Sequence, residues 1–150
     1  MKVKYRNFVP ADIFTLRKHM PFSQSENMVG MVAYDLETAR TVGMIIAQEF
    51  TKTSCMVHIV VISPMLLRPK YKFIWSACEW LFGKANLKKV FALVMDTNWK
   101  SRSLCEKIGF TEKAILEDAV DEGIDFILLE MGRHECNFWQ EPEMEKVANG

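Results

Sequence analysis

One continuous stretch, from an apolar run to a glycine–phenylalanine pair, most constrains how this chain can fold. The run Val90–Met95 has the unbroken apolar character of a strand that is buried on both faces. Asn98 follows it, and its side-chain oxygen is suited to accept an unpaired amide of a first helical turn. Gly109 stands where a helix ends most easily in a left-handed conformation, and Phe110 returns the chain to the core. The stretch therefore predicts a strand, a capped helix and a second strand.

The same stretch resembles a segment of a known enzyme superfamily. The order Asn98, Ser101, Leu104 and Glu106–Phe110 is similar to the "N…S…L.EK.GF" pattern of the GCN5-related N-acetyltransferase (GNAT) superfamily. The longer segment Asn98–Met131 also looks like acetyltransferase-like proteins of T7-like phages. The resemblance implies a sheet in which two parallel strands splay apart and leave a slot for acyl-CoA.

Composition limits the remaining possibilities. A chain of 150 residues with 49% hydrophobic residues suits a single domain with one core. The formal net charge of zero gives no reason to expect binding to nucleic acid or to an anionic membrane, and no apolar run is long enough to span a bilayer. The four cysteines lack the close pairs that chelate zinc, so we expect buried reduced thiols, a cytoplasmic location and no metal site.

Hydrophobic periodicity elsewhere predicts an α/β (α+β) domain, with a mixed, mostly antiparallel sheet and helices on both faces. We expect the strands that begin at Cys55 and Val90 to be the splayed parallel pair at its centre. Further strands are predicted at Val3–Phe8, Met28–Tyr34, Val42–Phe50, Lys113–Leu116 and Ile124–Met131, and helices at Pro10–Met20 and Lys70–Ala85. Residues 1–135 form the predicted acyltransferase-like domain, and residues 136–150 a polar tail in which Phe138 and Trp139 are candidates for docking on the domain.

Binding of acyl-CoA, which the resemblance implies, needs a site for the pyrophosphate. The family uses a loop with two glycines after the central strand, so that backbone amides approach the phosphates. Aligned on Arg68, the glycine positions hold Tyr71 and Phe73, and in the ungapped alternative they hold Lys70 and Lys72. Two interpretations stay open: the three cations hold phosphate through side-chain charge, or they form a solvated turn beside a closed pocket.

The resemblance also implies positions for proton transfer. The acid of many family members, a tyrosine seven residues after the asparagine, is replaced by Cys105, for which packing is the structural alternative. His58 on the central strand is the first candidate for a general base, and Glu49 near the end of the preceding strand is the second. A hydrogen-bonded core histidine and a solvated strand end are the alternatives for these two.

Three features complete the predicted site. Asn98 either contacts the pantetheine arm of the cofactor, as in the family, or only caps its helix. Backbone groups of Val61 and Ser63 are candidates for pairing with the pantetheine amides like an added strand. The acidic hairpin Glu117–Asp125 either attracts a cationic amine acceptor or is a solvated turn.

Two functions from different classes follow. The first is an acyl-CoA-dependent N-acyltransferase with an eroded cofactor loop, which moves an acetyl group from acetyl-CoA to a primary amine on a small molecule or a protein. The second is a degenerate, non-catalytic member that serves as a structural or binding protein and associates with other proteins of a virion. A fold by itself does not decide between them.

Overall fold

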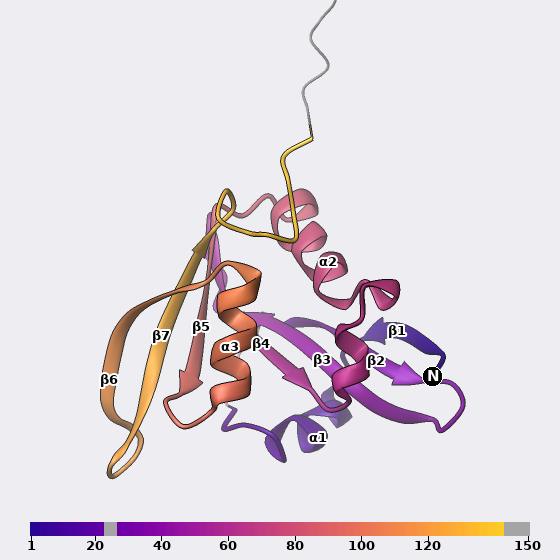
Figure 1. Ribbon diagram of the computed structural model, residues 1–150, viewed down its shortest axis with the longest axis horizontal. Helices are drawn as coiled ribbons and strands as arrows, with labels where there is room; N and C mark the ends of the chain where they lie inside the picture. The colour runs from indigo at the N-terminus through magenta and orange to yellow at the C-terminus, as the bar shows by residue number, and fades with distance from the viewer. Residues whose placement is uncertain (23–26, 143–150) are drawn as a thin grey trace, which may run out of the picture.

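The computed structural model describes residues 1–22 and 27–142. Its centre is a seven-stranded sheet with the strand order β1-β2-β3-β4-β5-β7-β6 (Figure 1). The strands are β1 (Val3–Asn7), β2 (Val29–Asp35), β3 (Arg40–Gln48), β4 (Ser54–Val61), β5 (Lys89–Met95), β6 (Thr111–Asp121) and β7 (Ile124–Gly132). The predicted class, a mixed and mostly antiparallel sheet with helices on both faces, is confirmed. The end of the predicted tail, residues 143–150, lies outside the described residues.

The parallel pair at the centre of the sheet separates as predicted. Three residue pairs join β4 to β5, from Ser54 opposite Lys89 to Met56 opposite Phe91. Beyond these pairs β4 stays with β3 as far as Val61, while β5 stays with β7. The carboxyl-terminal halves of β4 and β5 therefore diverge, and they leave a split between two half-sheets.

Helices cover both faces of this sheet (Figure 1). On one face lie α2 (Phe73–Cys78), which continues into the π-helical turn η4 (Glu79–Lys84), and α3 (Trp99–Ile108). On the other face α1 (Ile13–Arg17) follows the 3₁₀ turn η1 (Pro10–Asp12). Alternation along the strands feeds two cores, because Ile45 packs in the α2 and α3 cluster while its neighbour Ile46 packs with Leu16 of α1.

Two of the three predicted helices begin or end differently from the prediction. The predicted helix from Lys70 instead starts at Phe73, after the 3₁₀ turns η2 (Pro64–Leu67) and η3 (Pro69–Tyr71). Lys72 has a left-handed backbone with φ of 51°, which no α-helix accommodates in its interior. On the opposite face α1 ends at Arg17 rather than at residue 20.

The packed part of the chain extends past the predicted boundary at residue 135. Cys136 is 7% exposed and belongs to the main core cluster. The Phe138 ring lies 4.5 Å from the ring of Trp75, and the Trp139 ring lies 5.8 Å from that of Phe82. The start of the predicted tail therefore docks on α2 and η4, because aromatic surface on the helix is available to cover it.

Candidate functional site

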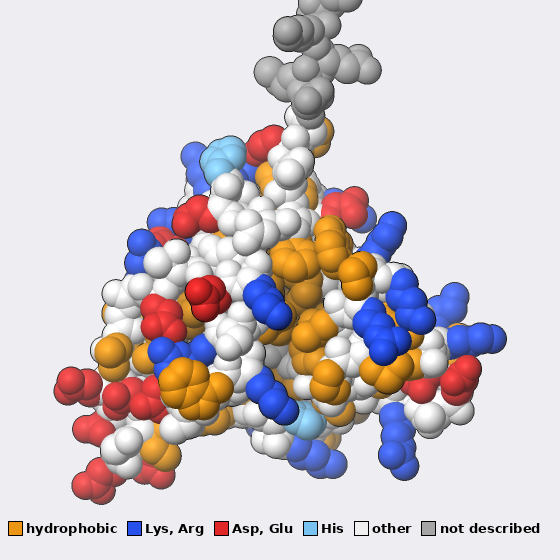
Figure 2. Space-filling model, in the orientation of Figure 1, with side chains coloured by type: hydrophobic (Ala, Val, Ile, Leu, Met, Phe, Trp, Pro, Cys, Tyr) orange, Lys and Arg blue, Asp and Glu red, His pale blue; other side chains and the backbone are white. Residues whose placement is uncertain are grey.

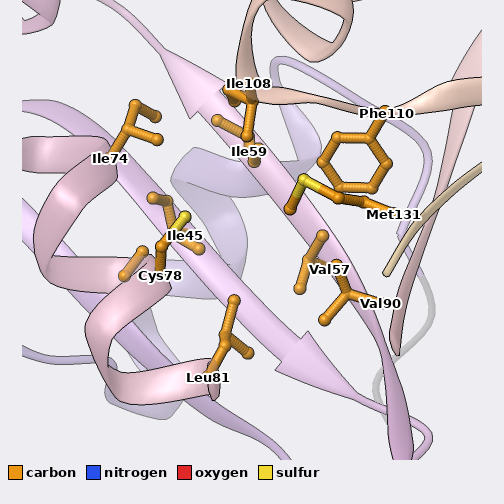
Figure 3. A pocket seen from close by; sticks show the side chains of 11 residues that line it. Ile45, Val57, Ile59, Ile74, Cys78, Leu81, Val90, Ile108, Phe110 and Met131 are labelled. Carbon is orange, nitrogen blue, oxygen red and sulfur yellow. The ribbon is translucent and has the colours of Figure 1, made fainter. Parts of the chain in front are cut away.

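The split between β4 and β5 opens beneath α2 and α3. Apolar side chains surround a cavity of about 20 Å³ at this place (Figure 3), contributed by Ile45, Val57, Ile59, Ile74, Ala77, Cys78, Leu81, Val90, Ile108, Phe110 and Met131. Such a volume holds about one water molecule, so the cavity marks imperfect filling and does not hold a ligand by itself. Figure 2 shows apolar side chains reaching the surface between α3 and α2, with Lys and Arg side chains on both sides.

The backbone of β4 directs hydrogen-bonding groups toward this split. The amide of Ile62 donates to the carbonyl of Val42 at 2.9 Å. Since bonded and non-bonded positions alternate in an antiparallel pair, Val61 and Ile59 occupy non-bonded positions toward β3. Their N–H and C=O groups point toward the diverging β5. The sequence predicts a role for the backbone of Val61 but not for that of Ile59, whose direction only the register of β3 with β4 reveals.

Ser63 differs from the prediction for its backbone. Its amide donates to the Val42 carbonyl at 3.0 Å, and its carbonyl accepts from the Leu66 amide at 3.0 Å. Both groups are thus used to start the loop after β4, so the predicted strand-like pairing at Ser63 is not available in this structure.

The two aromatic residues at the glycine positions of the family loop turn away from the split. The Phe73 ring is 1% exposed and stacks on Tyr5 of β1, with 6.3 Å between ring centroids. The Tyr71 hydroxyl donates to the Met1 carbonyl at 3.0 Å, and the Tyr5 hydroxyl donates to the Tyr71 carbonyl. Neither residue lines the cavity at the split.

Three exposed cations follow β4 in the loop that leads to α2, namely Arg68, Lys70 and Lys72. Lys72 has the positive φ that glycine adopts most easily, and this is a glycine position in the ungapped alignment. The first helical bond of α2 runs from the Ser76 amide to the Lys72 carbonyl at 2.9 Å, which leaves earlier amides of α2 directed out of its N-terminus. Positive charge and free amides therefore meet at this end of the helix.

His58 lies on the part of β4 that has left β5, and its ring faces the α1 side of the sheet. Its Nε2 lies 3.0 Å from the side-chain Nε2 of Gln48. A glutamine amide nitrogen only donates, so the His58 Nε2 accepts this hydrogen bond and the ring proton resides on Nδ1. Nδ1 is buried without a hydrogen-bond partner among the described residues. Phe22 packs edge-on against the ring at 5.3 Å. Burial lowers the pKa of His58 to about 4, so the ring is neutral at pH 7 and only weakly basic.

The other two catalytic candidates lie apart from His58. Cys105 lies on the buried side of α3 and is 4% exposed, and burial raises the pKa of its thiol to about 12. Glu49 is exposed directly after β3, with φ of 54°. No hydrogen bond joins His58, Cys105 and Glu49 within residues 1–22 and 27–142, so they do not form an acid–base pair in this structure.

Two polar side chains, those of Asp96 and Asn98, follow the carboxyl end of β5 beside the split. Asn98 caps α3, because its Oδ1 accepts from the Ser101 amide at 3.2 Å. Asp96, which the sequence analysis missed, has a buried Oδ1 without a hydrogen-bond partner in the described chain. Its backbone carbonyl accepts from the Arg102 guanidinium at 3.0 Å. An acidic residue directly after a buried strand was the available signal for Asp96.

The acidic hairpin between β6 and β7 uses its carboxylates to close its own turn. Asp125 Oδ1 accepts from the Asp118 amide at 2.9 Å, and Asp118 Oδ1 accepts from the Gly123 amide at 2.7 Å. Figure 2 shows the acidic side chains gathered at the end of this hairpin. The interpretation of this hairpin as a solvated turn therefore explains at least these two aspartates.

Residues 1–22 and 27–142 were also searched for clusters of metal ligands and for membrane-spanning helices, and neither is found among them. They contain no group of three or more His, Cys, Asp and Glu side chains arranged to hold a metal ion. None of their helices is both long and apolar enough to cross a membrane.

Comparison with known proteins identifies the fold. The sequence matches no protein-family profile and no curated protein. The structure is similar to spermidine/spermine N-acetyltransferase SpeG from Vibrio cholerae solved with manganese ions, with a TM-score of 0.66, 16% identity and coverage of 87% of this chain and 92% of that chain. It is also similar to mutant forms of that enzyme, with a TM-score of 0.68, 17% identity and coverage of 89% and 96%.

A third similar structure is spermidine N-acetyltransferase from Vibrio cholerae in complex with CoA and spermine. Its TM-score is 0.66 at 16% identity, with coverage of 89% of this chain and 96% of that chain. At this level of identity, the comparison establishes a GNAT-like fold for the chain.

Proposed function

We propose that this chain is an acyl-CoA-dependent N-acyltransferase that moves an acetyl group from acetyl-CoA to a primary amine. The observation that carries the proposal is the split itself, with backbone groups of Ile59 and Val61 directed into it. The pantetheine arm of CoA contains two amides, which pair with such groups in the manner of an added strand. A similar fold binds CoA and spermine in the Vibrio cholerae enzyme, which supports both the donor and the class of acceptor.

The exposed loop cations supply the second part of the proposed donor site. Arg68, Lys70 and Lys72 would attract the pyrophosphate to the N-terminus of α2, where amides of the first turn add partial positive charge. Phe73 would support this loop by stacking on Tyr5 of β1, and Tyr71 would support it through its hydrogen bond to Met1. Asn98 would position the start of α3 beside the split through its cap.

Transfer itself would depend mainly on positioning. The amine nitrogen attacks the thioester carbon, the new C–N bond forms, the C–S bond breaks with CoA leaving as its thiolate, and the proton lost by the amine restores the CoA thiol. His58 is the best-placed base, although its Nε2 must first leave Gln48 and its pKa of about 4 limits its strength. We therefore expect the rate to rise with pH as more of the acceptor amine becomes deprotonated. Cys105 would keep its proton and pack the core.

Thermal denaturation with acetyl-CoA tests the donor site. A ligand that binds only the folded chain stabilises it by about 2.7 kcal/mol at a concentration 100 times its Kd, which raises the melting temperature. The double variant Lys70→Glu/Lys72→Glu should bind at least about tenfold more weakly. The matched control is Lys88→Glu, an exposed lysine outside the loop, which should bind like the unmodified chain. An unchanged melting temperature at millimolar acetyl-CoA would refute the proposal.

Lys72→Gly separates the two means of holding phosphate. Glycine keeps the positive φ of this position and removes the charged side chain. If side-chain charge holds the pyrophosphate, the variant should bind acetyl-CoA more weakly than the unmodified chain. If backbone amides hold it, the variant should bind equally well or more tightly. Isothermal titration calorimetry distinguishes these results.

A second candidate function is that of a non-catalytic binding protein with the same fold, including a role within a virion. It is favoured by the occupied Nε2 of His58 and by the burial of Cys105. The version in which Phe138 and Trp139 dock on a partner is weakened, since both rings already pack on α2 and η4. Release of CoA thiol with spermidine or a lysine peptide as acceptor supports the enzyme. Binding of acetyl-CoA without thiol release from a panel of amines supports the second candidate.

A further inference from the structure

A groove separate from the split lies between the sheet and the continuous helix formed by α2 and η4. Its volume is about 590 Å³, within the range of about 300–1,000 Å³ that pockets for small molecules occupy. Strands β1, β2 and β3 form its floor, whereas the split lies between β4 and β5. Ile45, Ala77 and Leu81 line both the groove and the cavity at the split, so this helix stands between the two.

The floor of the groove is an apolar strip made of two cross-strand pairs. Val29 of β2 pairs with Ala47 of β3. Met31, two residues along β2 and therefore on the same face of the sheet, pairs with Ile45. Met31, Ile45 and Ala47 pack in the core cluster under α2, whereas Val29 is 44% exposed. Water therefore covers apolar floor that a ligand would bury.

The wall of the groove is the side of the helix that faces this strip. It includes side chains at spacings of three and four residues, which lie on one side of a helix, namely Ser76, Ala77, Trp80 and Lys84. Ser76 and Ala77 are short, so they leave space above the floor. The Trp80 ring packs edge-on against Phe50 at 6.2 Å, which holds the ring in place. The groove is therefore open between short side chains and bounded by a fixed aromatic ring.

The charged side chains that line the groove are cations. Within the described residues its lining contains no Asp or Glu, and its two cationic residues are Arg6 and Lys84. The Arg6 guanidinium is already paired, because it donates to both carboxylate oxygens of Asp12 at 2.7 Å. Lys84 is exposed and forms no ion pair in the part of the chain that the structure describes. The groove therefore complements a molecule with an apolar body and one negative charge.

We propose that this groove binds a small monocarboxylate with an apolar body. The apolar body would lie between the floor strip and Trp80, and the carboxylate would face Lys84. Most of the affinity would come from apolar surface removed from water, because an exposed ion pair contributes little. A straight-chain carboxylate such as decanoate is the simplest molecule of this class. The proposal does not depend on the acyltransferase activity, since the groove lies outside the split.

Isothermal titration calorimetry of the full chain with decanoate, below the concentration at which decanoate forms micelles, tests the proposal. We expect a single saturable site on each chain. Decyltrimethylammonium has a similar alkyl chain and the opposite charge, so it should bind at least about threefold more weakly. Saturating acetyl-CoA should leave the affinity for decanoate unchanged, because the groove and the split are separate.

Two substitutions test the floor and the charge separately. Val29→Glu places a carboxylate on the apolar floor and should weaken decanoate binding at least about tenfold. The matched control is Val9→Glu, since Val9 is 45% exposed and does not line the groove, and this variant should bind decanoate like the unmodified chain. Lys84→Glu should weaken binding about three- to tenfold at low salt and less at high salt.

Several results would overturn the proposal. The absence of saturable decanoate binding is one, and equal binding by Val29→Glu and Val9→Glu is another. Competition between acetyl-CoA and decanoate would assign the carboxylate to the split instead. A dimer of the unmodified chain in analytical ultracentrifugation that Val29→Glu dissociates would assign the groove to a second copy. Decanoate binding that appears only after removal of residues 143–150 would assign it to the end of the chain.

Discussion

Replacement of Gly109 by alanine should destabilise the chain by two separable effects. Gly109 ends α3 with φ of 128° and ψ of 10°, a conformation that costs a residue with a side chain about 1–2 kcal/mol. A Cβ atom added there would also lie 2.2 Å from the carbonyl oxygen of Glu135 and 3.2 Å from the Cα of Cys136. Both neighbours are backbone, so relief requires movement of the C-terminal segment, and overpacking of this kind costs about 1–3 kcal/mol. The expected total is about 2–5 kcal/mol.

Gly123→Ala is the matched control for the conformational effect. Gly123 has φ of 76°, and nothing lies within 4 Å of an added Cβ. This variant should therefore lose only about 1–2 kcal/mol. Urea denaturation at equal m values measures both losses, and their difference should be about 1–3 kcal/mol. Equal losses for the two variants would contradict the close approach of the C-terminal segment to α3.

Three further predictions concern single side chains. Burial lowers the pKa of His58 to about 4, so the unfolded chain takes up a proton at this residue first as the pH falls. The free energy of unfolding should therefore be at its full value above about pH 6.5 and should decrease by up to about 3 kcal/mol toward pH 4. His58→Gln should flatten this pH dependence in urea titrations. Asn98→Ala should remove the cap of α3 and cost about 1 kcal/mol, whereas Asn98→Asp should keep most of it. Asp12→Asn should cost about 1–3 kcal/mol at pH 7, since Asp12 binds Arg6 at 2.7 Å. Arg6 lowers the pKa of Asp12, so this contribution exists above the ordinary value of about 3.9 and disappears as the pH falls through the lower folded value, where the two chains should denature alike.

Much of the fold was predictable because its signals are local. The apolar run Val90–Met95, the cap at Asn98 and the turn at Gly109 each depend on a few neighbouring residues, and each lies where the sequence predicts. The start of α2 was not predictable in this way. Periodicity from Lys70 indicates a helix, yet two prolines and the left-handed Lys72 divert the chain through 3₁₀ turns first.

The candidate site was predicted only in part, because its geometry depends on which strands pair and in which register. Val61 was identified, whereas Ile59 was missed, since the direction of its backbone groups follows from the pairing of β3 with β4. Bulky residues at Tyr71 and Phe73 suggested a closed pocket. The Phe73 ring instead stacks on Tyr5 of β1, and the Tyr71 hydroxyl donates to the carbonyl of Met1, so both contacts are with the distant start of the chain.

Local signals in the sequence predict the order of strands and helices and the cap and end of α3, whereas the expectation of two parting parallel strands comes from the family resemblance. Hydrophobic periodicity and helix-capping residues involve only neighbours within one or two turns, so they can be recognised without knowledge of the tertiary structure. The folded arrangement alone sets where β4 leaves β5, which face His58 occupies, and that Cys136 joins the main core. These properties arise from contacts between residues distant in the chain, and no local propensity encodes them.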